Sequence, residues 1–239
     1  MSAVDITLFQ DEAALIGATV ADLTTRLQSA LSQRGRASLM LSGGSSPKPV
    51  YEALAQQPIA WDGVGISLVD ERWVPPGVPG SNADFVQACF AGTPAERAHF
   101  VPLYNGHDDA ASGVESAEQA LSTVARPFDI CVMGMGLDGH TASWFPHSRG
   151  LEAALRRDNL ATLCSIDATG CAVAGDHTDR MTLTYAAVAA SRHVCLLLNT
   201  AEKLDVFRQS LEGDVTDRPV ASLAQLGSRL SVHAVENAS

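Results

Sequence analysis

The stretch "FDICVMGMGLDGHTASW", residues Phe128 to Trp144, joins an apolar run to a glycine-rich segment. Residues Phe128–Met133 have the length and composition of a buried β-strand, and the glycines that follow let the backbone turn sharply. In open α/β sheets, ligands bind beyond the carboxyl ends of the strands. The stretch therefore predicts a strand followed by a loop that carries Asp138 and His140 at a ligand site.

The same alternation of strand and helix patterns extends in both directions from this stretch. The expected strands are Asp5–Phe9, Ala37–Leu41, Gly65–Val69, His99–Tyr104, Phe128–Met133, His193–Leu198 and Leu230–Val235, with Asn159–Ile166 and Cys171–Ala174 as a further strand pair. The expected helices are Gln10–Gln33, Pro47–Gln56, one opened by Ser81 or Asn82, Ala110–Val124, Leu183–Ala190 and Ala201–Leu211. This alternation predicts an α/β domain built on a mainly parallel sheet.

The organisation of the chain favours one domain. Its 239 residues, of which 46% are hydrophobic, can bury a substantial core, and this length permits one large domain or two small ones. It contains no internal repeat, low-complexity tract or proline- and serine-rich linker. We expect a single domain over residues 1–239, with a small lobe around residues 159–180.

Charge argues against several classes of partner, and hydropathy and cysteine content indicate the cellular setting. The formal net charge is −11 and no basic block is present, which argues against nucleic acid and anionic membrane as partners. No apolar stretch reaches the ~18 residues of a membrane helix, and the first residues lack a secretory signal pattern. The five cysteines include no C-x-x-C pair, which fits a reducing, cytoplasmic setting. An anionic ligand would require a few well-placed cations.

The segment "SGGSSPKP", residues Ser42 to Pro49, has the composition of an anion-binding turn. Its glycines permit close backbone approach, and the N–H groups of a helix start attract anions. The spacing is not that of a Walker loop, because G-x-x-x-x-G-K-[ST] is absent. An ordinary capped turn remains the alternative interpretation.

Three cations stand at other strand ends. Arg72, in "VDERWVPPGVPGSN", could offer a planar fork to a phosphate or carboxylate, or could belong to a solvated charge cluster with Asp70 and Glu71. Arg180 precedes an apolar run, and Lys203 lies one turn into a helix after a buried strand. Together the three could form an anion clamp; each could also be a surface residue.

His140 with Asp138 nearby is a candidate general base, because a carboxylate can hold an imidazole in one tautomer. A purely structural histidine is the alternative. The group Asp176, His177 and Asp179 matches no metal-ligand spacing, and no G-x-S-x-G elbow occurs. We therefore expect neither a metal nor a serine nucleophile.

The combined motifs resemble those of the 6-phosphogluconolactonases. "LSGGSSPKPVYEALA", "LVDERWVPPGVPGSN", "MGMGLDGHTASWFPHS" and "RMTLTYAAVAASRHVCLLLNTAEK" occur in that family's order, from about Leu41 to Lys203. The resemblance implies a Rossmann-like fold, mainly parallel and flanked by helices, in the NagB-like architecture shared with glucosamine-6-phosphate deaminases. It also implies cofactor-free hydrolysis of 6-phospho-D-glucono-1,5-lactone to 6-phosphogluconate, the second step of the oxidative pentose phosphate pathway.

The resemblance also implies roles by position. His140 resembles the general base that activates water, and Asp138 would orient it. The members of the phosphate site would be Gly43, Gly44, Ser45, Arg180 and Lys203, with Arg72 supporting them or the carboxyl end of the sugar. Trp144 departs from the smaller aliphatic residue often found in the lactonase loop, and its expected effect is a narrower pocket.

Two rival functions remain. One is an isomerase or deaminase of the same fold, although the deaminase loop typically has an acidic residue after "GxGxDGH" and here "TASWFPHS" has none. The other is a non-enzymatic sugar-phosphate-sensing domain, which would be accompanied by a basic helix-turn-helix segment that this acidic chain lacks. The expected partner is a small sugar-phosphate lactone, and a monomer and a weak homo-oligomer are both compatible with the sequence.

Overall fold

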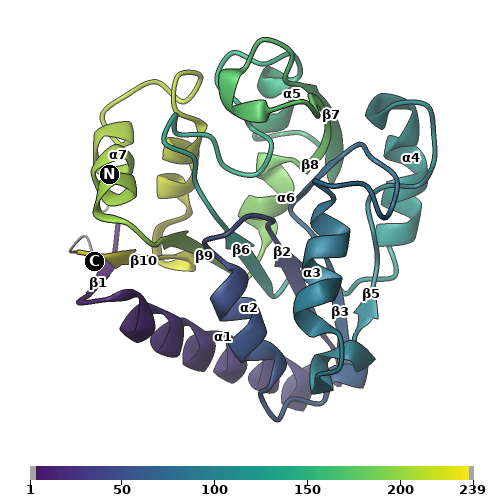
Figure 1. Cartoon of the computed structure of the whole chain (residues 1–239), viewed down its shortest axis with the longest axis vertical. Helices are drawn as coiled ribbons and strands as arrows, with labels where there is room; N and C mark the ends of the chain where they lie inside the picture. The colour runs from purple at the N-terminus through teal and green to yellow at the C-terminus, as the bar shows by residue number, and fades with distance from the viewer. Residues whose placement is uncertain (1–3, 237–239) are drawn as a thin grey trace.

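A seven-stranded parallel sheet forms the centre of the protein (Figure 1). The computed structural model describes residues 4–236. The strand order is β1-β10-β9-β6-β2-β3-β5, and every neighbouring pair is parallel. The strands are β1 (Ile6–Phe9), β2 (Ala37–Leu41), β3 (Val64–Leu68), β5 (His99–Phe100), β6 (Ile130–Met133), β9 (His193–Leu198) and β10 (Leu230–Val235). The predicted Rossmann-like α/β class is confirmed.

Helices follow the strands and cover the sheet. They are α1 (Glu12–Arg34), α2 (Lys48–Ala55), α3 (Asn82–Phe90), α4 (Ala110–Leu121), α5 (Leu151–Leu155), α6 (Tyr185–Ala190) and α7 (Ala201–Ser210). Helices α1, α2 and α3 lie next to one another along one side of the sheet (Figure 1). Helix α1 begins at Asp11, which accepts a hydrogen bond from the N–H of Ala14, and ends at Gly35 in the left-handed conformation. Within residues 4–236, no helix has the length and apolar content needed to cross a membrane.

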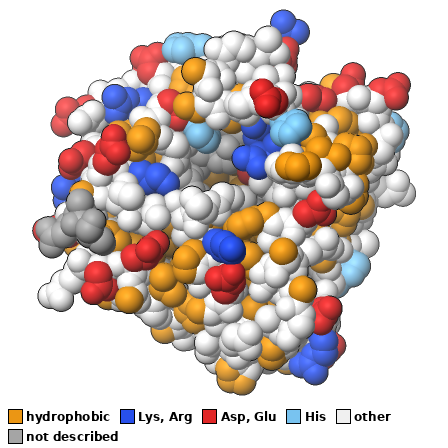
Figure 2. All heavy atoms as spheres, viewed as in Figure 1, with side chains coloured by type: hydrophobic (Ala, Val, Ile, Leu, Met, Phe, Trp, Pro, Cys, Tyr) orange, Lys and Arg blue, Asp and Glu red, His pale blue; other side chains and the backbone are white. Residues whose placement is uncertain are grey.

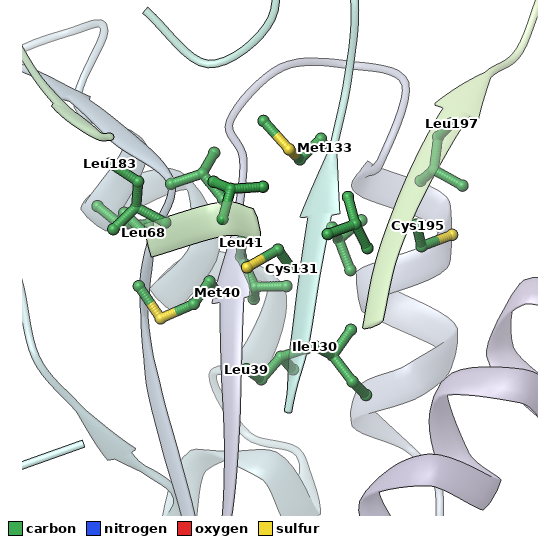
Figure 3. Close-up of a cluster of buried hydrophobic side chains, with 14 of the residues drawn as sticks. Leu39, Met40, Leu41, Leu68, Ile130, Cys131, Met133, Leu183, Cys195 and Leu197 are labelled. Atoms are coloured by element: carbon green, nitrogen blue, oxygen red, sulfur yellow. The ribbon is translucent and has the colours of Figure 1, made fainter. Parts of the chain in front are cut away.

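The core lies on both faces of the central strands. Every residue of β2, β6 and β9 is buried, which explains why these strands are almost wholly apolar in sequence, with Ser38 and His193 as the polar exceptions. Figure 3 shows side chains such as Leu39, Ile130 and Cys195 packed between neighbouring strands. This packing fixes the strands rigidly and hence the positions of the loops at their carboxyl ends.

A second, antiparallel sheet of three strands extends from the carboxyl ends of the main sheet. Its order is β4-β8-β7, with bounds Asp70–Arg72, Asp179–Leu183 and Leu163–Asp167. The chain passes directly from β3 into β4, and the N–H of Leu183 donates to the carbonyl of Val69 at 2.8 Å. The pairing register places Arg72 opposite Arg180.

The structure corrects several sequence-based expectations in this second sheet. Ala172–Ala174 forms a 3-10 turn rather than a strand, and the partner of β7 is β8. Neither β4 nor β8 was expected. Leu183 ends β8 instead of opening a helix, because Thr184 caps α6 through a hydrogen bond from the N–H of Ala187. The strand expected over His99–Tyr104 is limited to its first two residues.

Candidate active site

A pocket of about 240 Å³ opens beyond the carboxyl ends of β2, β3 and β6. We call it the central pocket. It is lined by Ser42, Gly43, Gly44, Ser45, Ser46, Pro47, Asp70, Arg72, Asn82, Gly134, Met135, Gly136, His140, Ala142, Phe145, Val173, Arg180 and Lys203. Figure 2 shows a hollow on this face with basic and histidine side chains gathered around it. All the site residues predicted from the sequence line this pocket except Asp138, which is bonded to His140.

His140 and Asp138 form a tight pair. The Nδ1 atom of His140 lies 2.6 Å from Oδ1 of Asp138, which also accepts the backbone N–H of His140 at 3.2 Å. Burial alone would raise the pKa of Asp138, but the hydrogen bonds from His140 lower it below its usual value. An ionised carboxylate only accepts hydrogen bonds, so Nδ1 must carry a proton, and in the neutral imidazole Nε2 then keeps its lone pair.

Glycines in the loop after β6 make room for this pair. A side chain at Gly136 would overlap the imidazole of His140 and approach Oδ1 of Asp138. Gly139 has a φ of +84° and packs against Arg218, so a side chain there would be both strained and crowded. Phe145 lies against the imidazole, with the ring centroids 4.6 Å apart. The loop thus holds the imidazole in one orientation at the wall of the central pocket.

Arg180 is a buried cation that also fastens a neighbouring loop. It is 3% exposed, and its guanidinium donates to the carbonyl oxygens of His177 at 2.5 Å and Ala174 at 2.7 Å. The group lies over the ring of Phe145 at 5.3 Å from the centroid. Burial lowers the pKa of Arg180 to about 10, so it stays charged at neutral pH. It therefore offers positive charge to the pocket from a fixed position.

Arg72 lies opposite Arg180 on the adjacent antiparallel strand. Its Nη1 donates to the carbonyl of Gly80 at 2.6 Å, while its buried Nε has no hydrogen-bond partner among the described residues. Two like charges on paired strands repel each other, and the nearby carboxylates of Asp70 and Glu71 offset part of this repulsion. The unpartnered Nε of Arg72 still leaves a donor for a ligand. This pair therefore favours an anionic ligand.

The turn after β2 and Lys203 supply the other side of the anion site. Gly44 has a φ of +103°, and a side chain at Gly43 would overlap that of Asn82. The Nζ atom of Lys203 donates to Ser46 Oγ at 2.8 Å. Burial lowers the pKa of Lys203, which has no carboxylate partner within the described part of the chain. An incoming phosphate would supply the missing counter-charge.

Sequence reasoning did not assign two further residues of the central pocket to the site. Asp70 was considered only as part of a charge cluster, and Asn82 only as a helix start. Asp70 is 6% exposed and accepts a hydrogen bond from Ser143 Oγ at 2.6 Å. Asn82 is 2% exposed and donates through Nδ2 to the carbonyl of Asp70 at 2.9 Å.

Glu71, the other acidic residue of that cluster, points away from the central pocket. Its carboxylate accepts the N–H groups of Arg72, Asn82 and Ala83 at 2.7–2.8 Å, and thereby caps the start of α3. Burial raises the pKa of Glu71 to about 7, against the lowering effect of these three bonds. Its hydrogen-bonding capacity is used by the helix, which leaves Asp138 and Asp70 as the carboxylates at the site.

Trp144 does not narrow the pocket. Its side chain is fully buried, its indole N–H donates to the carbonyl of Leu183 at 2.8 Å, and its ring packs near Tyr185. The backbone turns between His140 and Phe145, with Ala142 at a φ of +49°, and the indole lies in the interior among the strands of the small sheet. The large side chain is therefore a core residue of this loop.

Comparisons with known proteins agree with this geometry. The family model described as glucosamine-6-phosphate isomerases/6-phosphogluconolactonase matches residues 10–231. The chain belongs to this family. A 6-phosphogluconolactonase from Rhizobium meliloti is 34% identical over 228 residues, which are 95% of this chain and 96% of the relative. One from Xylella fastidiosa is 40% identical over 214 residues, or 89% of this chain and 88% of the relative.

Solved structures of the family superimpose over nearly the whole chain. The crystal structure of a 6-phosphogluconolactonase from Shewanella baltica gives a TM-score of 0.89 at 35% identity and covers 98% of both chains. A monomeric glucosamine-6-phosphate deaminase of the NagB superfamily gives a TM-score of 0.76 at 16% identity, a likeness of fold alone. Within the family, sequence identity therefore points towards the lactonase members.

Proposed function

We propose that this chain is a 6-phosphogluconolactonase, which hydrolyses 6-phospho-D-glucono-1,5-lactone to 6-phosphogluconate. The observation that carries the proposal is the His140–Asp138 pair, 2.6 Å apart, at the wall of a pocket that also contains Arg72, Arg180 and Lys203. The pair supplies a base for water, and the cations supply a site for a phosphate. The relatives that match the chain over most of its length carry this name.

The hydrolysis follows from the tautomer of His140. Because Nδ1 donates to Asp138, the free Nε2 takes a proton from a water molecule as the water oxygen attacks the lactone carbonyl carbon. The carboxylate of Asp138 stabilises the imidazolium that forms. When the tetrahedral intermediate collapses, the bond to the ring oxygen breaks and the imidazolium returns the proton to that oxygen. The product is the open-chain acid, and the imidazole is regenerated.

The cations position the lactone by its phosphate. Lys203, Arg180 and the backbone of residues 43–46 surround the anion site, with Arg72 beside it. Binding a group that is remote from the reacting carbonyl orients the carbonyl towards the base. In this proposal the phosphate provides binding energy and His140 provides the chemistry.

The alternative within the family is an amino-sugar phosphate deaminase. The nine residues from His140 to Ser148 contain no carboxylate, whereas the deaminase loop typically has one after its histidine. Without a second acid in this loop, the pocket lacks a group that the deaminase loop supplies. This difference favours the lactonase reaction.

A direct comparison of the two reactions tests the proposal. Freshly generated lactone is hydrolysed in an assay coupled to oxidation of 6-phosphogluconate, with the spontaneous rate subtracted, and ammonia release is measured with glucosamine 6-phosphate. We expect rapid lactone hydrolysis and no ammonia above background. Ammonia release that rivals lactone hydrolysis would overturn the assignment.

A further inference from the structure

Asp70 is a buried carboxylate that faces the central pocket. It is 6% exposed and lies where β3 continues into β4. Its Oδ2 accepts a 2.6 Å hydrogen bond from Ser143, and its Oδ1 lies 3.4 Å from Nδ2 of Asn82. It forms no ion pair among residues 4–236. Its charge acts on the neighbouring Arg180, but no cation among these residues contacts it directly. A buried carboxylate with no direct cationic contact in a cleft indicates a functional role.

The central pocket is rich in hydrogen-bond donors and has few charged acceptors. The charged side chains around Asp70 are donors: Arg72, Arg180 and Lys203. Asp70 is the single carboxylate among the lining residues. The lactone ring carries three hydroxyl groups, and each needs an acceptor when it leaves water. Because Nε2 of His140 is needed for the attacking water, Asp70 is the strongest acceptor left for a hydroxyl.

Hydrogen bonds from Ser143 and Asn82 fix the orientation of the Asp70 side chain. Ser143 is fully buried and lies three residues after His140, in the same loop. Asn82 is 2% exposed and holds the backbone carbonyl of Asp70 as well as approaching its side chain. Ser143 donates to Oδ2 and Asn82 approaches Oδ1, and each oxygen keeps a further lone pair for a ligand. The carboxylate is thus held in register with the loop that carries the base.

We propose that Asp70 is a specificity-determining residue that accepts hydrogen bonds from a ring hydroxyl of the sugar lactone, with Ser143 and Asn82 as positioning residues. The inference rests on the proposed lactonase function. It adds a third contact between the pocket and the substrate. The cations bind the phosphate, His140 faces the carbonyl, and Asp70 accepts a hydrogen bond from a ring hydroxyl. Three contacts fix the orientation of a rigid ring, whereas two leave it free to rotate about the line between them.

A cycle of enzyme variants and substrate variants tests this. Wild type and Asp70→Asn are assayed with 6-phosphogluconolactone and with its 2-, 3- and 4-deoxy derivatives. With wild type, removal of the contacted hydroxyl should lower kcat/KM roughly ten- to hundred-fold, the range for a hydrogen bond to a charged group. For the Asp70→Asn variant, kcat/KM with the parent lactone should fall by a comparable factor. With this variant, kcat/KM for the same deoxy derivative should lie within about three-fold of that for the parent.

The outcomes separate Asp70 from other roles. If wild type hydrolyses all three deoxy lactones with the same kcat/KM as the parent, no hydroxyl contributes to recognition. The inference is then wrong, whatever the variant does. If Asp70→Asn slows parent and deoxy lactones by one common factor, Asp70 only balances charge or supports the fold, and the inference again fails. Failure of wild type to hydrolyse the parent lactone would instead remove the proposed function itself.

Ser143→Ala tests the positioning role with the carboxylate left in place. The variant removes the 2.6 Å bond but no charge. We expect KM for the parent lactone to rise more than kcat falls, and the ratio of parent to deoxy kcat/KM to shrink towards one. An unchanged ratio would show that Ser143 does not orient Asp70. Thermal unfolding of both variants confirms that the fold is intact before the ratios are compared.

Discussion

At the scale of single residues, the ring nitrogen that carries the proton determines what His140 can do. Asp138 accepts from Nδ1 at 2.6 Å, and Phe145 lies against the ring, so neither the tautomer nor the orientation is free. The sequence predicted this pair, because both residues follow the same strand within two positions of each other. It could not predict the role of Asp70, whose contact with Ser143 spans 73 residues of the chain. Such a contact depends on the tertiary arrangement of two loops.

Substitution of His140 by asparagine removes the base and keeps a polar side chain of similar size. We expect kcat for lactone hydrolysis to fall about 10²–10⁴-fold, the usual contribution of general-base assistance. Binding of 6-phosphogluconate and the unfolding temperature should stay close to those of wild type. If kcat stays within a few-fold of wild type, His140 has only a structural role in its loop.

Lys203→Met removes the ammonium group of the anion site and keeps the aliphatic stem. Hydrogen bonds to charged groups contribute about 1.5–3 kcal/mol, so kcat/KM for the phosphorylated lactone should fall roughly ten- to hundred-fold. The unphosphorylated gluconolactone should be much less affected. The matched control is Lys48→Met. Lys48 is the other lysine of the chain; it is exposed and pairs with Glu52 on α2. Equal losses on both lactones would contradict a phosphate-binding role for Lys203.

Arg180 is a less selective test of the same site. It holds the carbonyl oxygens of Ala174 and His177 as well as facing the pocket. Its removal would disturb the loop over residues 172–177 together with the charge. Lys203, whose contacts are to the side chains of Ser46 and Asn199, isolates the charge better.

At the scale of elements, buried parallel strands were predictable and the small antiparallel sheet was not. The strands β2, β9 and β10 have the predicted bounds, because strands buried on both faces are rich in apolar residues and are therefore visible in the sequence. Strand β4 is only "DER", and β8 starts with "DR", so neither resembles a strand in isolation. Their pairing depends on the carboxyl end of β3 and on residues more than a hundred positions later.

The loop after β6 provides a test of how tightly the base is held. Gly136→Ala should lower kcat strongly, because the added methyl group would displace the imidazole of His140, while KM changes less. The matched control is Gly17→Ala in α1, where a side chain meets nothing within 4 Å and alanine favours the helix by about 1 kcal/mol. An active Gly136→Ala enzyme would show that the imidazole tolerates another position.

Helix α1 is attached to the sheet by a charged contact. Nε2 of the buried His193 lies 3.4 Å from Asp22, which also accepts from Arg26 at 2.9 Å. Burial by itself would raise the pKa of Asp22, but these two neighbours lower it to about 2.

Because the pKa of Asp22 is depressed in the folded state, its stabilising effect is complete above pH 4 and disappears as the pH falls through 2. Because solvent screens this partly exposed pair, Asp22→Asn should lower the free energy of unfolding at pH 7 by at most about 1 kcal/mol. The difference from wild type should shrink between pH 4 and pH 2 in urea titrations. Asp205→Asn, which breaks an exposed pair with Arg208, serves as control and should change little. A difference that does not depend on pH would contradict the ionic origin.

At the scale of the whole molecule, an acidic protein binds an anion by local charge. The net charge is −11, yet the charged side chains of the central pocket are three cations and one carboxylate. Salt at physiological strength screens exposed charges beyond about 8 Å, so the remote acidic surface has little effect inside the pocket. The positive potential that a phosphate meets therefore originates from Arg72, Arg180 and Lys203.

Hydrolysis by this molecule should not depend on a metal ion. Within residues 4–236, no group of three or more histidine, cysteine or acidic side chains is arranged to hold one. We expect exhaustive chelation followed by dialysis to leave kcat/KM unchanged. Loss of activity that zinc or magnesium restores would show that a metal takes part.

The position of β10 between β1 and β9 has a consequence for the order in which the protein folds. Strand β1 is synthesised first, but its hydrogen-bonding partner, residues 230–235, emerges more than two hundred residues later. Until then β9, which is apolar throughout after His193, has an open edge that could pair with another nascent chain. Such distant pairing makes closure slow, because loop entropy must be overcome before the contacts form. The ribosome-bound chain is thus most prone to aggregation just before its last strand inserts, which is when a chaperone would be most useful.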